Sequence, residues 1–552
     1  MAVTLRPSAA DVERYRTAGW WTDELVDEPV AAFAADPGTS GREAIVDGDV
    51  VVTYAELDRQ VDAVAGALHA LGIRPGDVVS WQLPNWWELV PLHYGIMRAG
   101  GVSNPILPIH RRHEVEFILR QAETKVFVHA ATFRGFDYRE MVAELAPRLP
   151  ALETTVVVRG EGDVAWGGRA FGDLLDGGPA PAVERSATDP ALLMYTSGTT
   201  SDPKGVVHPH ATLVRETRGC LETWGMTAAD RIFMAAPVTH ITGLLYGIHL
   251  PALVGTVVVL QDAWEPKRAL DLIERHRCTF TATATPFLHG MVHDDELGRR
   301  DLSSLRWIGV GGADVPPAMV REGEAVLGAQ VARAYGSTEV PTASLAWTTD
   351  PLDWRAETDG HAYEGTELRV VDDDGAVLPA GERGELQVRG PERFIGYLVP
   401  PAGEQVFDAD GWFATGDMAR LDALGRVAIE GRKKDIILRG GETISVKEVE
   451  DHLYQHPGIA EVSIVAMPDP VLVERACAFI VPADGEAPTL PELVAFLKGR
   501  GVAIQKCPER VEAVDALPKN STGKVQKFKL RERIATLLAD EAPAQEAARQ
   551  AS

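Results

Sequence analysis

The 552-residue sequence contains few cysteines. There are four, Cys220, Cys278, Cys477 and Cys507, and they lie far apart in the chain. No pair has the close spacing that is typical of a zinc site or a dithiol redox motif. We therefore expect four free thiols in a reducing compartment, which favours a cytoplasmic protein.

Positive charge is also scarce. The chain has 54 Lys and Arg against 80 Asp and Glu, and its formal net charge is −26. A nucleic-acid-binding surface needs an excess of basic residues, so the composition argues against a nucleic-acid partner. An anionic substrate would have to be attracted by local positive groups, because the field of the whole protein repels it.

Long hydrophobic runs are nearly absent. Residues 1–6 lack the apolar core of a signal peptide. Residues 243–260 are almost entirely apolar, but they contain His249, Pro251 and Gly255 and end in β-branched residues. This pattern predicts a buried helix, a break and a buried strand, and no membrane span.

The remaining composition is that of a globular protein, with 45% hydrophobic and 24% charged residues. Up to about residue 360, predicted strands alternate with predicted helices, which indicates stacked α/β sheets in a large N-terminal domain, residues 1–431. Residues 360–430 are rich in strands and Asp/Gly turns, which predicts a β-barrel-like subdomain. Residues 432–536 are expected to form a small α+β C-terminal domain, and residues 537–552 are expected to fray.

A run of small and hydroxylated residues follows the predicted strand 191–194. It reads Tyr195-Thr196-Ser197-Gly198-Thr199-Thr200-Ser201-Asp202-Pro203-Lys204-Gly205. Glycine lets the backbone approach an anion, the hydroxyl groups donate hydrogen bonds and the lysine adds a charge, so the run suits a polyphosphate. It is not the Walker pattern, because the lysine precedes the last glycine.

Four other turns that follow predicted strands carry reactive or small side chains. They are residues 237–240, 285–287, 311–313 and 335–339. In open α/β sheets, ligands bind beyond the carboxyl ends of the strands. We expect these four turns to meet in one crevice.

The run 195–205 resembles the phosphate loop, Y-T-S-G-T-T-x-x-P-K-G, of the adenylate-forming superfamily of acyl-CoA synthetases, peptide-synthetase adenylation domains and luciferases. Residues 335–339 (Y-G-S-T-E), 415–417 (T-G-D), 431–435 (G-R-K-K-D) and 517–524 (L-P-K-N-S-T-G-K) resemble further motifs of that superfamily, in the same order. Ser201 departs from the pattern, which usually has glycine there. The likeness covers roughly residues 30–535.

The resemblance implies roles for individual residues. The catalytic residues would be Lys524, His240, Thr338 and Glu339, with Glu339 as the Mg²⁺ ligand. Lys434 would be the hinge between the domains. Gly440 and Gly441 would form the wall of the CoA tunnel. The ATP site would consist of Thr196, Ser197, Gly198, Thr199, Thr200, Lys204, Gly312, Ala313, Tyr335, Gly336, Thr338, Asp417, Ile429 and Arg432.

The implied reaction is ATP-dependent adenylation of a carboxylic acid, followed by transfer of the acyl group to CoA with release of AMP and pyrophosphate. Transfer to the thiol of a separate carrier protein is the alternative within the superfamily. A luciferase-like oxidation is left open, and a P-loop phosphohydrolase is disfavoured because the Walker order is missing. The oligomeric state is left open, a homodimer included.

The acyl substrate is predicted from a few residues only. The candidate pocket residues are His240, Gly243, Thr285, Phe287, Val310 and Gly311. Thr285, Phe287, Val310 and Gly311 are apolar or small, and they include no acidic partner for an α-amino group. We therefore expect a monocarboxylate of ring or medium-chain size, as in ligases for cyclohexanecarboxylate, medium-chain or aromatic acids.

Overall fold

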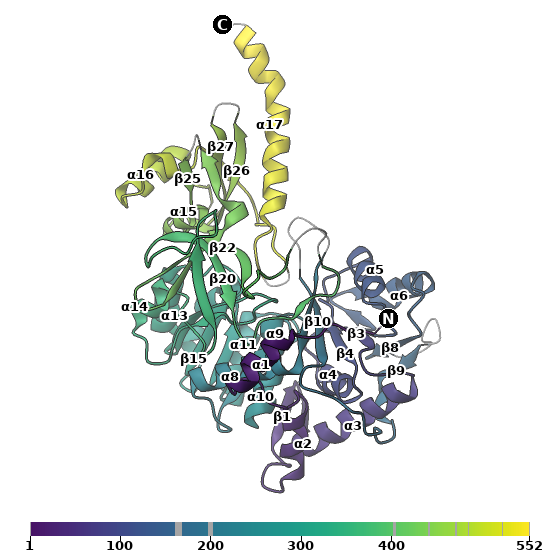
Figure 1. Cartoon of the computed structure of the whole chain (residues 1–552). Coiled ribbons are helices and arrows are strands. Elements are labelled where there is room, and N and C mark those ends of the chain that lie inside the picture. Colours follow the sequence, from purple (N-terminus) through teal and green to yellow (C-terminus); the bar gives the residue numbers. More distant parts are fainter. Residues whose placement is uncertain are drawn as a thin grey trace.

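The computed structural model describes residues 2–160, 168–196, 203–400, 405–439, 442–469, 472–483, 485–520 and 523–550. It has a large N-terminal domain with three main sheets and a smaller C-terminal domain that sits on it (Figure 1). This mixed α/β architecture confirms the predicted fold class. Within the described residues, no helix combines the length and the apolar character needed to cross a membrane.

The first sheet has nine strands in the order β18-β17-β16-β15-β14-β12-β13-β1-β2. Its six central strands, from β16 to β1, are parallel. The strand bounds are β1 Glu43–Asp47, β2 Val50–Thr53, β12 Arg231–Met234, β13 Val257–Leu260, β14 Phe280–Thr283, β15 Trp307–Gly311, β16 Gln330–Tyr335, β17 Ser344–Leu345 and β18 His361–Ala362. Strand β13 is buried along its whole length, as expected of a central parallel strand covered on both faces.

The second sheet has eight strands in the order β21-β11-β10-β4-β3-β5-β8-β9, parallel from β10 to β9. The strand bounds are β3 Val78–Gln82, β4 Val102–Pro105, β5 Val126–Ala130, β8 Thr154–Val158, β9 Arg169–Ala170, β10 Pro190–Tyr195, β11 Gly205–Pro209 and β21 Gly396–Tyr397. A separate short hairpin joins β6 (Thr132–Phe133) and β7 (Phe136–Asp137).

Fourteen α-helices of the described large domain cover these sheets and connect their strands. They are α1 Ala9–Thr17, α2 Glu28–Ala35, α3 Tyr54–Ala70, α4 Leu89–Arg98, α5 Arg112–Gln121, α6 Tyr138–Leu145, α7 Phe171–Leu175, α8 His210–Trp224, α9 Ile241–Leu244, α10 Leu250–Val254, α11 Pro266–His276, α12 Thr285–Val292, α13 Pro317–Leu327 and α14 Leu352–Glu357. The apolar segment 243–260 forms α9, a π-helical turn, α10 and then β13, with Gly255 in the left-handed region (φ 74°) as the break.

The strand-rich segment forms an antiparallel sheet in the order β19-β20-β22-β23. The strands are β19 Glu367–Val371, β20 Arg383–Arg389, β22 Phe413–Leu421 and β23 Val427–Arg432. Among the described residues this order is an open path, so the predicted β-barrel-like subdomain is a four-stranded sheet. Its buried face packs on a core of its own around Phe394 and Phe413.

The small domain is built on β26 (Ile459–Asp469) and β27 (Val473–Pro482), with β24 (Ile437–Arg439), β25 (Glu442–Ile444) and β28 (Arg510–Ala513). The helices are α15 Val446–Leu453, α16 Leu490–Gly499 and α17 Lys527–Gln550. Helix α17 projects away from the body of the molecule (Figure 1). It extends into the tail 537–552, for which fraying stays a prediction.

Candidate active site

The carboxyl ends of β12, β14, β15 and β16 lie side by side at one edge of the nine-stranded sheet. Thr283 pairs with Val310, and Gly311 pairs with Ala334, so the turns that follow these strands start at the same level. A cavity of about 620 Å³ lies beyond this edge, which is a normal size for a small-molecule site. The predicted site residues that line it are Thr196, Lys204, His240, Val310, Gly311, Gly312, Tyr335, Gly336, Thr338, Glu339, Asp417, Arg432, Lys434 and Lys524.

The candidate phosphate loop connects two paired strands. Tyr195 at the end of β10 pairs with Gly205 at the start of β11, and the Thr196 amide donates a hydrogen bond to the Lys204 carbonyl (3.0 Å). The Lys204 ammonium lies 5.2 Å from the ring centroid of Tyr397. The predicted contacts Ser197, Gly198, Thr199 and Thr200 lie outside the described residues, so their role stays a prediction.

Asp417 contacts two other residues that were predicted to bind the nucleotide. Its Oδ2 accepts a hydrogen bond from the Tyr335 hydroxyl (2.6 Å), and its Oδ1 lies 3.4 Å from Arg432 Nε. The three residues come from β16, β22 and the end of β23, so the Asp417 carboxylate connects the first sheet to the antiparallel sheet. Asp417 is only 9% exposed, so its carboxylate is a fixed hydrogen-bond acceptor in the cavity wall.

Because Gly336 has no side chain, the turn that follows it can fold back against the backbone at this position. A Cβ atom at this position would lie 1.9 Å from the Pro341 carbonyl oxygen. The turn carries Thr338 and Glu339, and the Ser337 amide donates to the Val340 carbonyl (2.8 Å). The glycine is therefore required by close backbone packing behind the two candidate catalytic residues.

Two residues that the sequence analysis did not assign hold Thr338 and Glu339 in place. The Tyr397 hydroxyl donates to Glu339 Oε1 (2.9 Å), and His208 Nε2 lies 2.8 Å from the Thr338 carbonyl oxygen. Burial lowers the pKa of His208 to about 4, so the ring is neutral and donates from Nε2. Tyr397 belongs to β21, which pairs with β11 directly after the phosphate loop.

Lys524 of the small domain reaches the cavity of the large domain. Its amide donates to Asn520 Oδ1 (2.8 Å), and both residues line the cavity. Burial and then the positive charge of Arg432 lower the pKa of the Lys524 ammonium to about 8. Burial and then the charge of Lys524 lower the pKa of His240 to about 4, so His240 is neutral. The two candidate catalytic residues thus share one site.

Two of the predicted acyl-pocket residues lie elsewhere. Phe287 packs on Trp264 (ring centroids 4.6 Å apart) in the core under α12, because the first turn of that helix turns it away from the sheet edge. Gly243 is buried, and a Cβ there would lie 2.2 Å from the Pro237 carbonyl oxygen. It allows α9 to pack on the turn that carries His240, and it is not among the residues that line the cavity.

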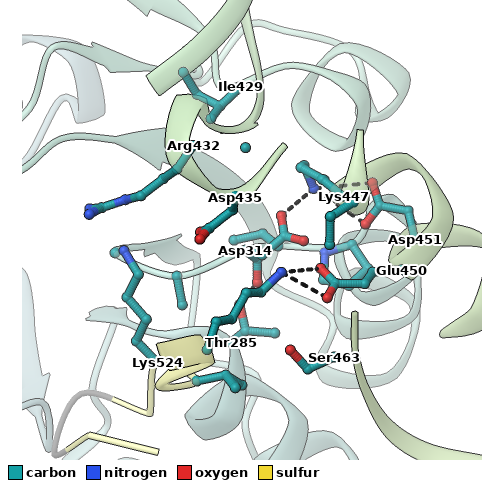
Figure 2. Close-up of a pocket in the computed structure, with 18 of the residues that line it drawn as sticks. Thr285, Asp314, Ile429, Arg432, Asp435, Lys447, Glu450, Asp451, Ser463 and Lys524 are labelled. Carbon is teal, nitrogen blue, oxygen red and sulfur yellow. Dashed lines mark hydrogen bonds and ion pairs between the residues drawn. The ribbon is translucent and has the colours of Figure 1, made fainter. Parts of the chain in front are cut away.

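A second cavity, of about 440 Å³, lies between the two domains (Figure 2). Thr285, Ala313 and Ile429, which were predicted for the acyl pocket and the ATP site, line this cavity. Gly312, Tyr335, Gly336, Asp417, Arg432, Lys434 and Lys524 line both cavities. The predicted tunnel residues Gly440 and Gly441 lie outside the described residues.

The chain is similar to known proteins along most of its length. A family model described as AMP-binding enzyme matches residues 33–398, and one described as AMP-binding enzyme C-terminal domain matches residues 448–524. The chain is 36% identical to a medium-chain fatty-acid–CoA ligase of Escherichia coli over 97% of this chain and 94% of that protein. It is 34% identical to a 2,3-dihydroxybenzoate-AMP ligase of Bacillus subtilis over 95% of this chain and 96% of that protein.

A solved structure has the same overall fold. The anthranilate CoA ligase AuaEII, in complex with anthranoyl-AMP, superposes with a TM-score of 0.86 at 27% identity. The match covers 94% of this chain and 98% of that one. It includes both domains, so the likeness extends to the small domain that carries Lys524.

Proposed function

Because the chain belongs to the AMP-binding enzyme family, we propose that it is an acid–CoA ligase, which adenylates a carboxylic acid with ATP and passes the acyl group to CoA. The observation that carries the proposal is the position of Lys524 in one cavity with His240 and Asp417. A relative that is 36% identical is named as a medium-chain fatty-acid–CoA ligase, which supports the choice of CoA as acceptor.

In the adenylation step, a carboxylate oxygen of the acid attacks the α-phosphorus of ATP and pyrophosphate leaves. Asp417 would accept hydrogen bonds from the ribose hydroxyls, and Tyr335 would contact the adenine. The cationic Lys524 would stabilise the negative charge that builds up around the α-phosphate, as a preorganised charge does in other phosphoryl-group transfers. The product would be an acyl-adenylate, which is a reactive acyl donor.

Glu339 suits the Mg²⁺ that the family implies. One carboxylate oxygen accepts from Tyr397, and the carboxylate borders the cavity beside Thr338. Mg²⁺ is commonly bound by one or two protein carboxylates together with substrate phosphates, so a single acidic residue is sufficient. The ion would supply charge neutralisation at the phosphates.

The second half-reaction would need a different orientation of the small domain. β23 ends at Arg432, and the short 3-10 turn Lys433–Asp435 leads into β24, so a rotation at Lys434 would carry Lys524 out of the cavity. Such a domain motion would let the CoA thiol approach the acyl carbonyl and displace AMP. The predicted tunnel at Gly440 and Gly441 belongs to this step.

The pKa of Lys524 leads to a pH prediction. The ammonium is the charged form, so raising the pH through about 8 removes the positive charge from the free enzyme. We expect kcat/KM for adenylation to fall by one power of ten per pH unit above this value, since kcat/KM reports the pKa values of the free enzyme. In Lys524→Arg the side chain stays charged, so kcat/KM should not fall in this way. A fall in kcat/KM near pH 8 that persists in this variant would assign the titration to another group.

The apolar end of the cavity supports a compact acyl group. Trp224, Tyr246, Ala282, Gly309 and Val310 line it. The six-membered ring of Trp224 covers Gly309, where an added Cβ would lie 3.2 Å from Trp224 Cζ2. Trp224 also packs on Phe280, with ring centroids 4.6 Å apart, so it closes the cavity. A monocarboxylate of ring or medium-chain size fits this enclosure.

Opening this end should change the preferred chain length. In Trp224→Leu we expect the best straight-chain acid to become longer by about two to four carbons, because the indole is replaced by a smaller side chain. The measurement is kcat/KM for a series of acids from four to sixteen carbons. Trp347→Leu, at a tryptophan that is 44% exposed elsewhere, is the control. An unchanged order of preference in Trp224→Leu would show that Trp224 does not limit the pocket.

A carrier-loading enzyme is the second candidate. It is supported by the 34% identical relative that is named as an AMP ligase of an aryl acid, because that name does not mention CoA. Both candidates perform the same first step, so they differ only in the thiol that receives the acyl group.

A panel of free acids in ATP–pyrophosphate exchange tests the first step. We expect exchange with alicyclic, aromatic or medium-chain acids and none with amino acids. Exchange only with amino acids, or only with acids beyond about sixteen carbons, would contradict the proposed substrate class, since such groups do not suit a compact apolar pocket. No exchange with any acid would contradict adenylation itself.

A further inference from the structure

Lys447 of the small domain lies between two carboxylates. It is on α15, and its ammonium contacts Asp314 Oδ1 of the large domain. The same ammonium lies 3.1 Å from Asp451 Oδ2, one helical turn further along α15. Figure 2 shows Lys447 between the two acids at one side of the interdomain cavity.

Asp314 is connected to the surface on which the loop of Lys524 rests. The Thr285 hydroxyl donates to the Asp314 carbonyl oxygen (2.6 Å). Pro286, the next residue, packs closely against Gly523. A Cβ atom added to Gly523 would lie 2.6 Å from Pro286 Cγ. The turn after β15 and the start of α12 therefore contact the small domain in two places, at Lys447 and directly before Lys524.

From this juxtaposition we propose that Asp314, Lys447 and Asp451 form a reversible interdomain latch, which holds the small domain in the orientation that places Lys524 in the nucleotide cavity. Lys447 and Asp314 are positioning residues, which act through Lys524. The latch rests on the proposed function only in the test that measures adenylation. It goes beyond that function because it assigns to Lys447 and Asp314 the selection of one domain orientation.

Asp451 makes the latch reversible. When the small domain rotates, Lys447 must leave Asp314, which belongs to the other domain, but it keeps its i,i+4 partner on α15. The ammonium is therefore never left without a carboxylate, which lowers the cost of opening. Burial and then the negative charge of Asp314 raise the pKa of Asp451 above its usual range, as expected where two acids share one lysine.

The solvation of the pair sets the size of the expected effect. The Lys447 side chain is 12% exposed and that of Asp314 is 41% exposed, toward the cavity. Solvent screens a partly exposed ion pair, so its contribution is modest. We therefore expect loss of the Asp314–Lys447 pair to lower ATP–pyrophosphate exchange by about five- to tenfold. This is near the lower end of the coupling that is typical between two conformational states.

The first test separates the two half-reactions. Lys447→Met and Asp314→Asn should each lower ATP–pyrophosphate exchange by about five- to tenfold, and the double variant should lose no more than either single variant. Thioester formation from a pre-made acyl-adenylate should be unchanged or faster. Lys506→Met is the matched control, because its pair with Glu448 (2.7 Å) also involves α15 but stays inside the small domain. It should leave both half-reactions unchanged.

The second test measures domain orientation without any substrate. Spin labels at Val326→Cys and Ile504→Cys, two exposed positions on different domains, give one interdomain distance. The four natural cysteines are buried and should stay unlabelled. We expect one main distance in the labelled parent and a second or broader population when Lys447→Met is added.

The outcomes separate this proposal from the proposed function. Equal loss of both half-reactions in Lys447→Met with an unchanged distance distribution overturns the latch, because the residue then serves the fold or the site itself. Unchanged exchange with an unchanged distance also overturns it. If the parent enzyme shows no exchange with any acid, the proposed function fails and the distance measurement alone decides the latch. A lowered melting temperature in Lys447→Met makes Asp314→Asn the deciding variant.

Discussion

Replacing Lys524 by alanine should lower ATP–pyrophosphate exchange by at least about 10²-fold, which is the scale of losing one preorganised charge donor. The ammonium shares the cavity with His240 and Asp417. It belongs to the small domain, so the domain rotation that we propose would remove it from the cavity. Thioester formation from a pre-made acyl-adenylate should therefore be nearly unaffected. The two half-reactions are measured separately on the same preparation.

The control for this variant is Lys529→Ala, at an exposed lysine on α17 that follows the same loop. It should leave both half-reactions within twofold of the parent, as is usual for surface substitutions away from a site. Near-normal exchange in Lys524→Ala would remove this lysine from catalysis. Loss of the thioester step as well would show that it serves more than adenylation.

Replacing Gly336 by alanine should lower ATP–pyrophosphate exchange nearly as much as Lys524→Ala does, for a steric reason. The added Cβ would lie 1.9 Å from the Pro341 carbonyl oxygen, so the backbone of the turn has to move. The same turn carries Thr338 and Glu339, and a displacement of about 1 Å at a reacting centre can cost about 10²-fold in rate. We expect pyrophosphate exchange to fall by that factor.

Gly172→Ala is the control for Gly336→Ala, because a Cβ at Gly172 meets no atom within 4 Å. Exchange in Gly172→Ala should equal that of the parent. Both variants are compared by thermal unfolding, so that a folding defect is separated from displacement of the turn. Full activity in Gly336→Ala would contradict the close approach on which the turn depends.

The position of the cavity could be predicted from the sequence for a general physical reason. Parallel strands align their carboxyl ends, so the turns that contain His240, Gly311 and Tyr335 had to meet at one edge of the sheet. The alternation of strands and helices also predicted the stacked α/β sheets of the large domain. The motif order then indicated that Lys524 and Asp417 belong to the same site.

Contacts between distant elements could not be predicted in this way. Tyr397 reaches Glu339 because β21 pairs with β11, and nothing in the local pattern around residue 397 indicates that pairing. Phe287 was assigned to the acyl pocket from its place after a strand, but the orientation of the first turn of α12 buries it against Trp264. The Asp314–Lys447 contact depends on how the two domains dock, which no local sequence pattern indicates.

Incubation of the enzyme with an accepted acid, ATP, Mg²⁺ and free CoA, followed by identification of the products by mass, tests the claim that this chain joins a carboxylic acid to CoA. We expect acyl-CoA, AMP and pyrophosphate in equal amounts, with AMP release that depends on CoA. Acid-dependent pyrophosphate exchange without acyl-CoA, at saturating CoA, would contradict the claim and assign the acyl group to another acceptor.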